Sequence, residues 1–286
     1  MIDLPAKAAV GRHRMPRRIR RWRRDLVGST ALVTGASSGV GRAVSLELAR
    51  RGVRVLATAR RGDRLAALAD QAAGLAGGPI LTLAGDITDP VFRGQLLAMT
   101  ERDGLDVVVA AAGSGAIGAF GNATADTLTR IMDIDFIAPA ELIREAIPAL
   151  RQSRDSAIVL VGSILGYHPL PLHSEYCAAK SALKSLAGSL RMELADDHID
   201  VLLASLGPTA SEFWDNLLTG SRPTWSRGRP MSAERTARII VRGLVLRRRE
   251  VRPGWRAKCF VLAARLFPRL FERVMICRRH RIPPTS

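Results

Sequence analysis

Residues 34–41 read Thr34-Gly35-Ala36-Ser37-Ser38-Gly39-Val40-Gly41, and this segment decides the fold of the chain. It follows an apolar run at 30–34 that has the length of a β-strand, and it opens a segment of helical period at 40–50. Glycines let a backbone turn tightly and approach a ligand, while a helix N-terminus offers unpaired N–H groups to a pyrophosphate. A small-residue turn without a ligand is the alternative, but strand, glycine turn and helix in this order are typical of a dinucleotide site.

The rest of the chain repeats this alternation. From about residue 29 to residue 205, apolar runs of strand length alternate with longer segments of helical period, which is typical of βαβ units around a parallel sheet. The predicted strands are 30–34, 54–59, 80–84, 107–111, 157–161 and 201–204, with a seventh near Val251; the predicted helices are 40–50, one around Leu65 and Leu68, 92–99, 126–136, 138–150 and 176–195. We therefore expect an α/β fold, a Rossmann-like, doubly wound parallel β-sheet of six to seven strands with helices on both faces.

The size and charge of the chain indicate one domain with two basic tails. With 286 residues and 47% hydrophobic content, the chain is long enough for one large domain, which we place at 26–254. The formal net charge is +17, of which residues 1–24 carry +8 and residues 242–286 carry +11. Because the N-terminal arm, 1–25, has little apolar content to bury, it is predicted to be disordered.

The basic tails leave their surroundings open. A solvated arm and an anionic membrane surface both fit, whereas nucleic acid is disfavoured because no helix-turn-helix, zinc-finger or RNA-recognition pattern accompanies the charge. In the C-terminal extension, 255–286, apolar residues recur at helical spacing from Lys258 to Cys277, and Pro268 is predicted to interrupt or kink that helix. A basic amphipathic helix can lie in a membrane interface, pack on its own domain or join a second subunit.

Cysteine usage and hydropathy point to the cytoplasm. The three cysteines, Cys177, Cys259 and Cys277, form no CxxC pair and no disulfide framework, so no metal site is predicted. The N-terminus lacks the apolar core of a signal peptide, and no stretch of about 18 apolar residues occurs in the sequence. We expect a cytoplasmic protein, with membrane association through the basic tails as an open alternative.

Three polar residues carry the strongest chemical signal. Ser163 follows a buried strand, and twelve residues lie between it and Tyr176-Cys177-Ala178-Ala179-Lys180. Positions i and i+4 share one face of a helix, so Tyr176 and Lys180 are predicted to project together. A free tyrosine has a pKa of about 10, and a neighbouring cation favours its anion. Either residue alone would indicate only core or solvent, but their joint spacing with Ser163 favours catalysis.

These motifs resemble those of the short-chain dehydrogenase/reductase family, from about Leu26 to Gly254, and the glycine turn is similar to the family's TGxxxGxG cofactor motif. The resemblance implies an oxidoreductase that interconverts a carbonyl and an alcohol by hydride transfer. It implies that Tyr176 is the general acid or base, that Ser163 hydrogen-bonds the substrate oxygen, and that Lys180 binds the nicotinamide ribose and tunes Tyr176.

The second predicted strand carries the cofactor preference. It ends in Thr58-Ala59-Arg60-Arg61, without the acid that holds a ribose 2′-OH, and arginine pairs well with a 2′-phosphate. We therefore predict that NADP(H) is preferred, with NAD(H) as the alternative. Asp86 is similar to the family acid that holds the adenine, although it could equally cap the following helix. The predicted cofactor-binding residues are Gly35, Ser37, Ser38, Gly39, Val40, Gly41, Arg60, Asp86, Ile87, Ala112, Gly113, Tyr176, Lys180, Gly207 and Thr209.

The chain departs from the family pattern at three places. Ala110-Ala111-Ala112-Gly113 replaces Asn-Asn-Ala-Gly, so side-chain hydrogen bonds that brace the sheet are expected to be absent. Asp135 stands where many members place an asparagine that holds a proton-relay water. If ionised, it could pair with Lys180 and offset the cation beside Tyr176. Leu206 replaces the proline before Gly207, in a loop expected to contact the nicotinamide amide and to lead into a substrate lid at about 209–231.

Two hypotheses about function follow. The first is an NADP-preferring enzyme acting on a small-molecule carbonyl or alcohol, which would be lipophilic if the C-terminal extension lies in a membrane. The second is a cofactor-binding scaffold or sensor that has lost turnover through Asp135 and neighbouring changes. The resemblance also implies a homodimer or homotetramer. Surface or core roles are expected for His168, His173 and His198, because they lack the spacing of a metal site or a catalytic triad.

Overall fold

A seven-stranded parallel sheet forms the centre of the computed structural model, which describes residues 23–74, 77–100, 102–222 and 230–278. The strands lie in the order β11-β7-β6-β4-β1-β2-β3, and every pairing between them is parallel. Their bounds are β1 Thr30–Thr34, β2 Arg54–Ala59, β3 Ile80–Ala84, β4 Val107–Ala110, β6 Ala157–Ser163, β7 Asp200–Leu206 and β11 Glu250–Val251. The predicted doubly wound fold, including a seventh strand near Val251, is confirmed.

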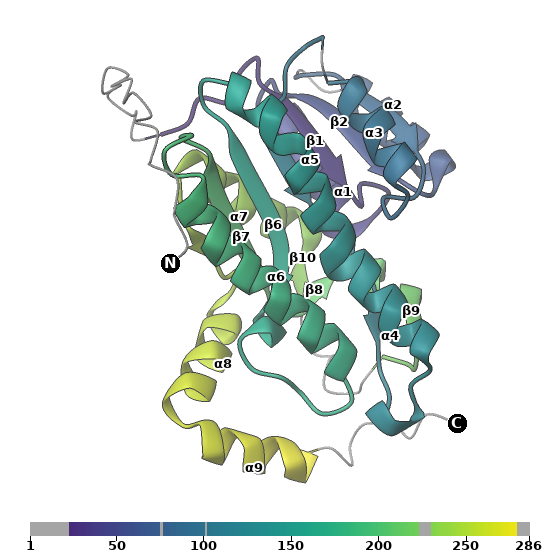
Figure 1. Cartoon of the computed structure of the whole chain (residues 1–286), viewed down its shortest axis with the longest axis vertical. Helices are drawn as coiled ribbons and strands as arrows, with labels where there is room; N and C mark the ends of the chain where they lie inside the picture. Colours follow the sequence, from purple (N-terminus) through teal and green to yellow (C-terminus); the bar gives the residue numbers. More distant parts are fainter. Residues whose placement is uncertain (1–22, 75–76, 101, 223–229, 279–286) are drawn as a thin grey trace, which may run out of the picture.

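Helices cover both faces of this sheet. On one face lie α1 Gly39–Ala49, α2 Gly62–Ala73 and α7 Ala233–Val245; on the other lie α3 Pro90–Ala98, α5 Ala138–Gln152 and α6 Ser174–Glu193, of which α5 and α6 cross in front of the sheet in Figure 1. Successive strand residues point to opposite faces, so Ala31 and Val33 pack into the first layer and Leu32 into the second. Because β1 pairs with both β2 and β4, the strand order reverses beside it, and ligands bind at such a reversal.

The remaining short elements surround the carboxyl ends of the strands. Two small parallel pairs lie here: β5 with β9 connects the loop after β4 to the segment after β7, and β8 with β10 joins two parts of the segment after β7. Their bounds are β5 Gly115–Ala116, β8 Thr209–Ala210, β9 Leu217–Thr219 and β10 Met231–Ser232; the short 3₁₀ helices are η1 Phe120–Asn122, η3 Ile164–Gly166 and η4 Glu212–Asn216. The predicted lid, 209–231, therefore contains β8, η4 and β9, and its residues 223–229 lie outside the described part.

One helical region differs from its prediction. The sequence predicts separate helices at 126–136 and 138–150, but the chain continues from α4, Ala125–Met132, through one π-helical turn, η2 Asp133–Ile137, directly into α5. Pro139 lies in the first turn of α5 and has no N–H to donate, so the normal hydrogen-bond pattern is interrupted without breaking the helix. The wider π turn includes Asp135, whose side chain is fully buried.

The N-terminal boundary also differs by two residues. The charge pattern assigns Arg24 to the basic arm, but its guanidinium is buried and bonds Asp155, Asp200 and the Ser156 carbonyl. Arg247 pairs with the same two carboxylates, at 2.7 and 2.6 Å. The two acids precede or begin neighbouring strands, so only the folded sheet brings them together. The rest of the predicted arm, 1–22, lies outside the described residues.

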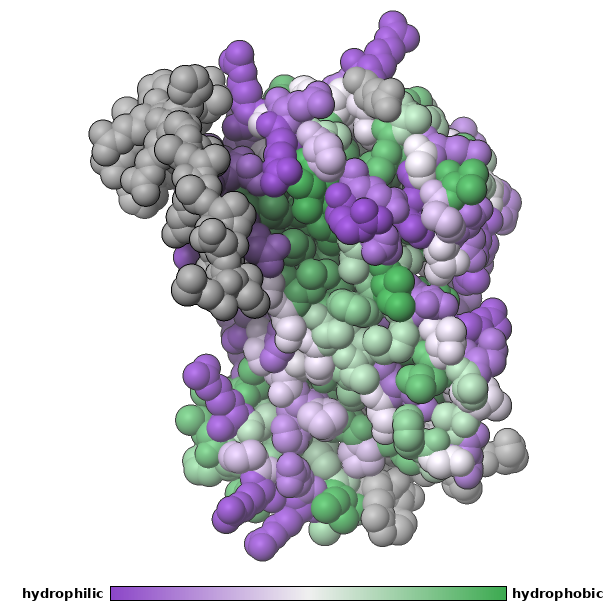
Figure 2. Space-filling view, viewed as in Figure 1, coloured by the Kyte–Doolittle hydropathy of each residue, from purple (hydrophilic) through white to green (hydrophobic). Residues whose placement is uncertain are grey.

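Two helices, α8 Trp255–Leu266 and α9 Pro268–Arg278, follow the last strand, and the predicted interruption at Pro268 separates them. Ala257 and Val261 of α8 pack against Ile164, Leu165 and Cys177. Phe271 of α9 contacts the rings of His168 and Phe260, so this helix also packs on its own chain. Figure 2 shows apolar and hydrophilic side chains interspersed at the lower end of the molecule, where Figure 1 places α8 and α9. No described helix is both long enough and apolar enough to cross a membrane.

Candidate active site

The glycine turn is held between the ends of β1 and β4. Gly35 has φ +67°, and a Cβ there would lie 2.7 Å from the carbonyl oxygen of Ala111, so only glycine fits. The Thr34 hydroxyl accepts hydrogen bonds from the backbone N–H groups of Ala111 and Ala112, both at 3.1 Å. This threonine therefore ties β1 to the Ala110–Gly113 segment, where the family's asparagine side chains were expected to be missing.

A large cavity of about 1440 Å³ lies at the carboxyl ends of the strands, in contact with this turn. Every residue predicted for the site lines it, although these residues come from eight separate stretches of sequence. They are Gly35, Ser37, Ser38, Gly39, Val40, Gly41, Arg60, Asp86, Ile87, Ala112, Gly113, Asp135, Ser163, Tyr176, Lys180, Gly207 and Thr209.

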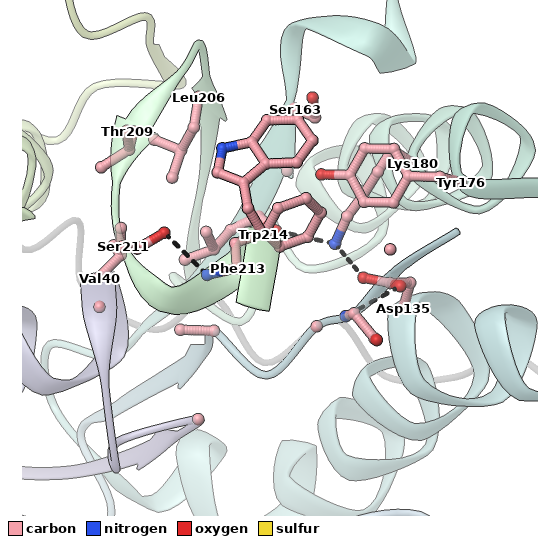
Figure 3. A pocket seen from close by; sticks show the side chains of 18 of the residues that line it. Val40, Asp135, Ser163, Tyr176, Lys180, Leu206, Thr209, Ser211, Phe213 and Trp214 are labelled. Atoms are coloured by element: carbon pink, nitrogen blue, oxygen red, sulfur yellow. Dashed lines mark hydrogen bonds and ion pairs between the residues drawn. The ribbon is translucent and has the colours of Figure 1, made fainter. Parts of the chain in front are cut away.

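Ser163, Tyr176 and Lys180 all line this cavity, and Figure 3 shows their side chains in one region of it. Ser163 is the last residue of β6, and its hydroxyl accepts a hydrogen bond of 3.1 Å from Leu165 N, which fixes its position at the start of η3. Tyr176 and Lys180 lie one turn apart in the first half of α6, and the Lys180 Nζ is 5.6 Å from the centre of the tyrosine ring. The predicted common face of these two residues is therefore observed.

Asp135 forms a buried ion pair with Lys180. Its Oδ1 lies 2.7 Å from the lysine Nζ, close enough for an ion pair although not aligned as a hydrogen bond, and its Oδ2 accepts a hydrogen bond of 3.2 Å from Ser114 N (Figure 3). Burial is the largest effect on the Asp135 carboxyl and raises its pKa, although Lys180 opposes this. An ion pair alone would lower that pKa, so desolvation outweighs the pair here. Burial lowers the pKa of Lys180, but the opposing effect of Asp135 and Tyr176 is larger. The pKa of the lysine is therefore raised above its usual value.

The two charged neighbours act in opposite directions on Tyr176. Burial raises the pKa of its hydroxyl above the usual value, because the anion is poorly solvated in the cavity. The Lys180 ammonium lowers that pKa, as does the Ser163 hydroxyl, whereas the Asp135 carboxylate raises it. In the protein alone, burial outweighs Lys180. The expected action of the lysine is therefore present, and Asp135 offsets part of it.

The arginine that contacts the glycine turn is Arg61. Its guanidinium donates hydrogen bonds to the hydroxyls of Ser37, at 3.0 Å, and Ser38, at 2.8 Å, whereas Arg60 is exposed at the cavity edge. The sequence predicted Arg60 as the cofactor-binding residue, whereas the contacts with the turn are made by its neighbour Arg61. Arg61 occupies the N-cap position of α2, and this position turns its side chain toward the glycine turn.

Asp86 lies in the cavity and does not cap the next helix. Its Oδ1 accepts hydrogen bonds from the backbone N–H and the hydroxyl of Thr88, both at 2.9 Å. The N-cap of α3 is Asp89, whose side chain accepts from Val91 N. The capping alternative for Asp86 is therefore wrong, because the helix begins three residues later than that alternative requires.

An apolar wall of the cavity was not found from the sequence. Phe213 of the lid packs against the Tyr176 ring with centroids 5.5 Å apart, and Trp214 follows it. Another part of the lining comes from Trp255, Phe260 and Met275, on the two helices after the last strand. Their helical spacing indicated an amphipathic surface, and nothing in that pattern specified a cavity.

Comparison with known proteins agrees with this geometry. Residues 29–221 match the family model described as short chain dehydrogenase. The chain belongs to the short-chain dehydrogenase family. It is 32% identical over 258 residues to hydroxysteroid 11-beta-dehydrogenase 1-like protein A of Xenopus laevis, a match that covers 87% of this chain and 86% of the relative. It is 30% identical over 193 residues to bovine retinol dehydrogenase 8, covering 66% and 62% of the two chains.

A solved structure shares the fold. The crystal structure of a short-chain dehydrogenase from Streptomyces avermitilis superposes with a TM-score of 0.75 at 25% identity, covering 87% of this chain and 98% of that chain. Family membership identifies the protein as an NAD(P)-dependent oxidoreductase that acts on CH–OH groups. The cavity just described is therefore its candidate active site.

Proposed function

We propose that this protein interconverts a carbonyl and an alcohol with NADP(H), with Ser163, Tyr176 and Lys180 at the reaction centre. The observation that carries the proposal is the convergence of these three side chains on the cavity that the glycine turn also lines. Ser163 ends β6, and Tyr176 and Lys180 lie one turn apart on α6.

The residues around the cavity fit a dinucleotide. The missing Cβ at Gly35 lets the turn pack closely on the Ala111–Ala112 backbone, and α1 begins in the cavity with N–H groups suited to a pyrophosphate. In this proposal the glycine turn holds the pyrophosphate, Asp86 and Ile87 hold the adenine, Lys180 holds the nicotinamide ribose, and Gly207 and Thr209 contact the nicotinamide. When bound, the nicotinamide supplies or accepts the hydride.

Each catalytic side chain has a separate task. In carbonyl reduction, Tyr176 donates its phenolic proton to the substrate oxygen, and in alcohol oxidation its anion accepts the proton. Ser163 donates a hydrogen bond to the same oxygen and so stabilises the charge that develops there. Lys180 counteracts the effect of burial on Tyr176 by favouring the anion. Asp135 positions the lysine through their ion pair.

The preference for NADP(H) rests on the charge beside the glycine turn. The end of β2 carries Arg60 and Arg61 and no acid, and Arg64 follows on α2. A guanidinium that already donates to Ser37 and Ser38 is well placed for a 2′-phosphate. NADH oxidation at equal or higher kcat/KM than NADPH oxidation would contradict this preference.

The substrate proposed is a lipophilic ketone, aldehyde or alcohol. Phe213, Trp214, Trp255, Phe260 and Met275 give the wall beyond Tyr176 a large apolar surface. The relatives named above as hydroxysteroid and retinol dehydrogenases support this substrate class, because their names specify apolar alcohols. A panel that ranges from short to long carbonyl compounds is expected to give a KM that falls as apolar surface increases.

We further propose that α8 and α9 contact an anionic membrane. They expose Leu262, Leu266, Phe267 and Leu270, each between 56% and 61% accessible, beside Arg265, Arg269 and Arg273. Sedimentation with anionic vesicles is expected at low salt and is expected to weaken as salt screens the arginines. A Leu266→Ser/Leu270→Ser variant that sediments like the wild type would contradict the proposal.

The decisive experiment follows NADPH oxidation with a panel of aldehydes and ketones. Tyr176→Phe is expected to lower kcat/KM by about 10²–10⁴-fold, the usual contribution of general acid–base catalysis, while NADPH still binds. Tyr167→Phe is the matched control, because this is the chain's other tyrosine and it bonds Glu250 instead of lining the cavity. Unchanged turnover in Tyr176→Phe would contradict the mechanism.

The second candidate function, a cofactor-binding scaffold or sensor, is favoured by one observation. The Lys180–Asp135 ion pair gives the lysine a partner that competes with Tyr176 for its charge. NADPH binding by the wild type, with no turnover on any member of the panel, would support this second function over the first.

A further inference from the structure

The lid is anchored on the glycine turn. Ser211 lies directly before η4, and a Cβ at Gly39 would lie 2.9 Å from the Cβ of Ser211. Gly39 has φ +53° and is part of the turn at the start of α1, so the lid backbone lies against the same turn that is suited to phosphates. Glu212, the first residue of η4, directly follows Ser211 in the chain.

Glu212 occupies a site built from two arginines. Its Oε2 accepts hydrogen bonds from Arg61 Nη1, at 3.0 Å, and from Arg64 Nη1. The Nη2 group of Arg61 donates to the hydroxyls of Ser37 and Ser38 at the same time. Two guanidinium groups on one anion, one of them fixed by two serine hydroxyls, form a donor set that also suits a phosphate.

The contact is charged and exchangeable. Hydrogen bonds from Arg64 first, and from Arg61, hold the pKa of Glu212 below its usual value, so the carboxylate is ionised at neutral pH. The side chains of Arg61, Arg64 and Glu212 are 34%, 41% and 39% exposed, and ion pairs that water reaches are individually weak. A stronger anion can therefore replace the carboxylate.

We infer that Glu212 competes with the 2′-phosphate of NADP(H) for Arg61 and Arg64, and so couples the choice of cofactor to the position of the lid. The inference rests on the proposed NADP(H) preference, and it identifies Glu212 as a residue that weakens NADP(H) binding. A 2′-phosphate carries about −1.5 to −2 charges and three acceptor oxygens, whereas the carboxylate carries one charge, so the phosphate pairs better with two arginines. Once the phosphate is bound, like-charge repulsion displaces Glu212.

A cofactor without the 2′-phosphate leaves this contact in place. NAD(H) presents only a ribose hydroxyl to the arginines, so Glu212 keeps both ion pairs and η4 keeps its anchor on α2. The two cofactors therefore leave the lid in two different states. Because Phe213 and Trp214 follow Glu212 and line the cavity, the displacement reaches the proposed substrate wall.

The test compares ligands that differ by the 2′-phosphate alone, using the full chain. Equilibrium binding is measured for NADPH against NADH and for 2′,5′-ADP against 5′-AMP, in the wild type and in Glu212→Gln. Asp215→Asn is the matched control, because this exposed lid residue loses the same charge and forms no ion pair with Arg61 or Arg64, both of which are described.

Glu212→Gln is expected to tighten NADPH and 2′,5′-ADP binding by about three- to tenfold, the size of one or two exposed ion pairs, and to change NADH and 5′-AMP binding less than about twofold. Asp215→Asn is expected to leave the affinity ratios unchanged. Trp214 fluorescence is expected to respond to 2′,5′-ADP more strongly than to 5′-AMP in the wild type, with Trp214→Phe identifying the signal.

The outcomes separate this inference from the function on which it rests. An unchanged or reversed ratio in Glu212→Gln, in a protein that oxidises NADPH, would overturn the competition and leave the proposed function intact. A wild type that favours NADH while the ratio still shifts in Glu212→Gln would support the competition and contradict the NADP(H) preference. If neither dinucleotide binds, the change in the affinity ratio of 2′,5′-ADP to 5′-AMP in Glu212→Gln still tests whether Glu212 competes with the phosphate.

Discussion

At Asp135 a carboxylate lies where an amide was expected, and its negative charge acts on both of its neighbours. Tyr176 already has a raised pKa because it is buried, and Asp135 raises it further. The lysine that should favour the tyrosine anion is at the same time held 2.7 Å from this carboxylate. Asp135 therefore holds Lys180 in place and offsets part of the decrease that the lysine causes in the pKa of Tyr176.

Asp135→Asn should shift the pH dependence of alcohol oxidation. Oxidation needs the Tyr176 anion, and removal of the Asp135 charge lowers the pKa of that tyrosine, so the acidic limb of kcat/KM should move to lower pH. Asp133→Asn, in the same π turn but outside the cavity lining, is the control. An acidic limb that stays in place, or moves to higher pH, would show that Asp135 does not act through Tyr176.

Cys177 follows the proposed catalytic tyrosine, but we expect it to be unreactive. It is 3% exposed, and burial raises its pKa to about 11. Because the thiolate is the nucleophile, a rise of about two units lowers its population at pH 8 by roughly a hundredfold. Iodoacetamide followed by peptide mass spectrometry should label the exposed Cys259 and Cys277 first and Cys177 only after unfolding. Equal rates for all three would contradict the burial.

His173 makes stability depend on pH. It is 3% exposed, and burial lowers its pKa although its Nδ1 lies 2.8 Å from the Pro171 carbonyl oxygen. Below about pH 6.5, the usual pKa of histidine, the unfolded chain binds a proton at His173 that the folded protein binds only at lower pH. The free energy of unfolding therefore falls as the pH drops below about 6.5. Urea unfolding should therefore show a steeper loss of stability below pH 6.5 in the wild type than in His173→Gln. Equal slopes would argue against this origin.

At the scale of elements, the strands and most helices follow from hydrophobic periodicity. The π turn could not be predicted this way, because the change from α to π geometry depends on the missing N–H of Pro139 and on the burial of Asp135 among α4, α5 and α6. Similarly, Arg24 belongs to a basic run of sequence that is typical of a solvated arm, but its side chain is buried. Its two acidic partners lie 131 and 176 residues away, beyond any local pattern.

Replacement of Arg24 should therefore destabilise the junction of β6 and β7. Arg24→Met removes one of the two arginines that pair with both Asp155 and Asp200, while Arg247 still pairs with them. We expect a loss of about 1–3 kcal/mol in the free energy of unfolding, less than for a fully buried pair because both acids are partly exposed. Arg23→Met, at an exposed position, is the control. Urea unfolding measures both variants, and equal stabilities would rule out a structural role for the Arg24 pair.

At the scale of the whole molecule, the sequence indicated where the chemistry lies and much less of what encloses it. The glycine turn and the Ser163, Tyr176 and Lys180 spacing placed the cavity at the strand ends, because parallel strands direct their carboxyl ends to one edge. The wall formed by α8 and α9 was missed, since an amphipathic period identifies an apolar face without its partner. Oligomeric state stays a prediction.

The position of that wall after the last strand has a consequence for how such a protein can change. β11 completes the sheet at Val251, so residues 255–278 contribute no hydrogen bonds to it, yet Trp255, Phe260 and Met275 face the cavity. The segment therefore shapes the cavity from outside the sheet. Grafting the corresponding segment of a relative, together with the residues of η3 and α6 on which it packs, should transfer substrate range and leave nucleotide affinity with the host. New specificities can then arise in this segment without a change in the sheet.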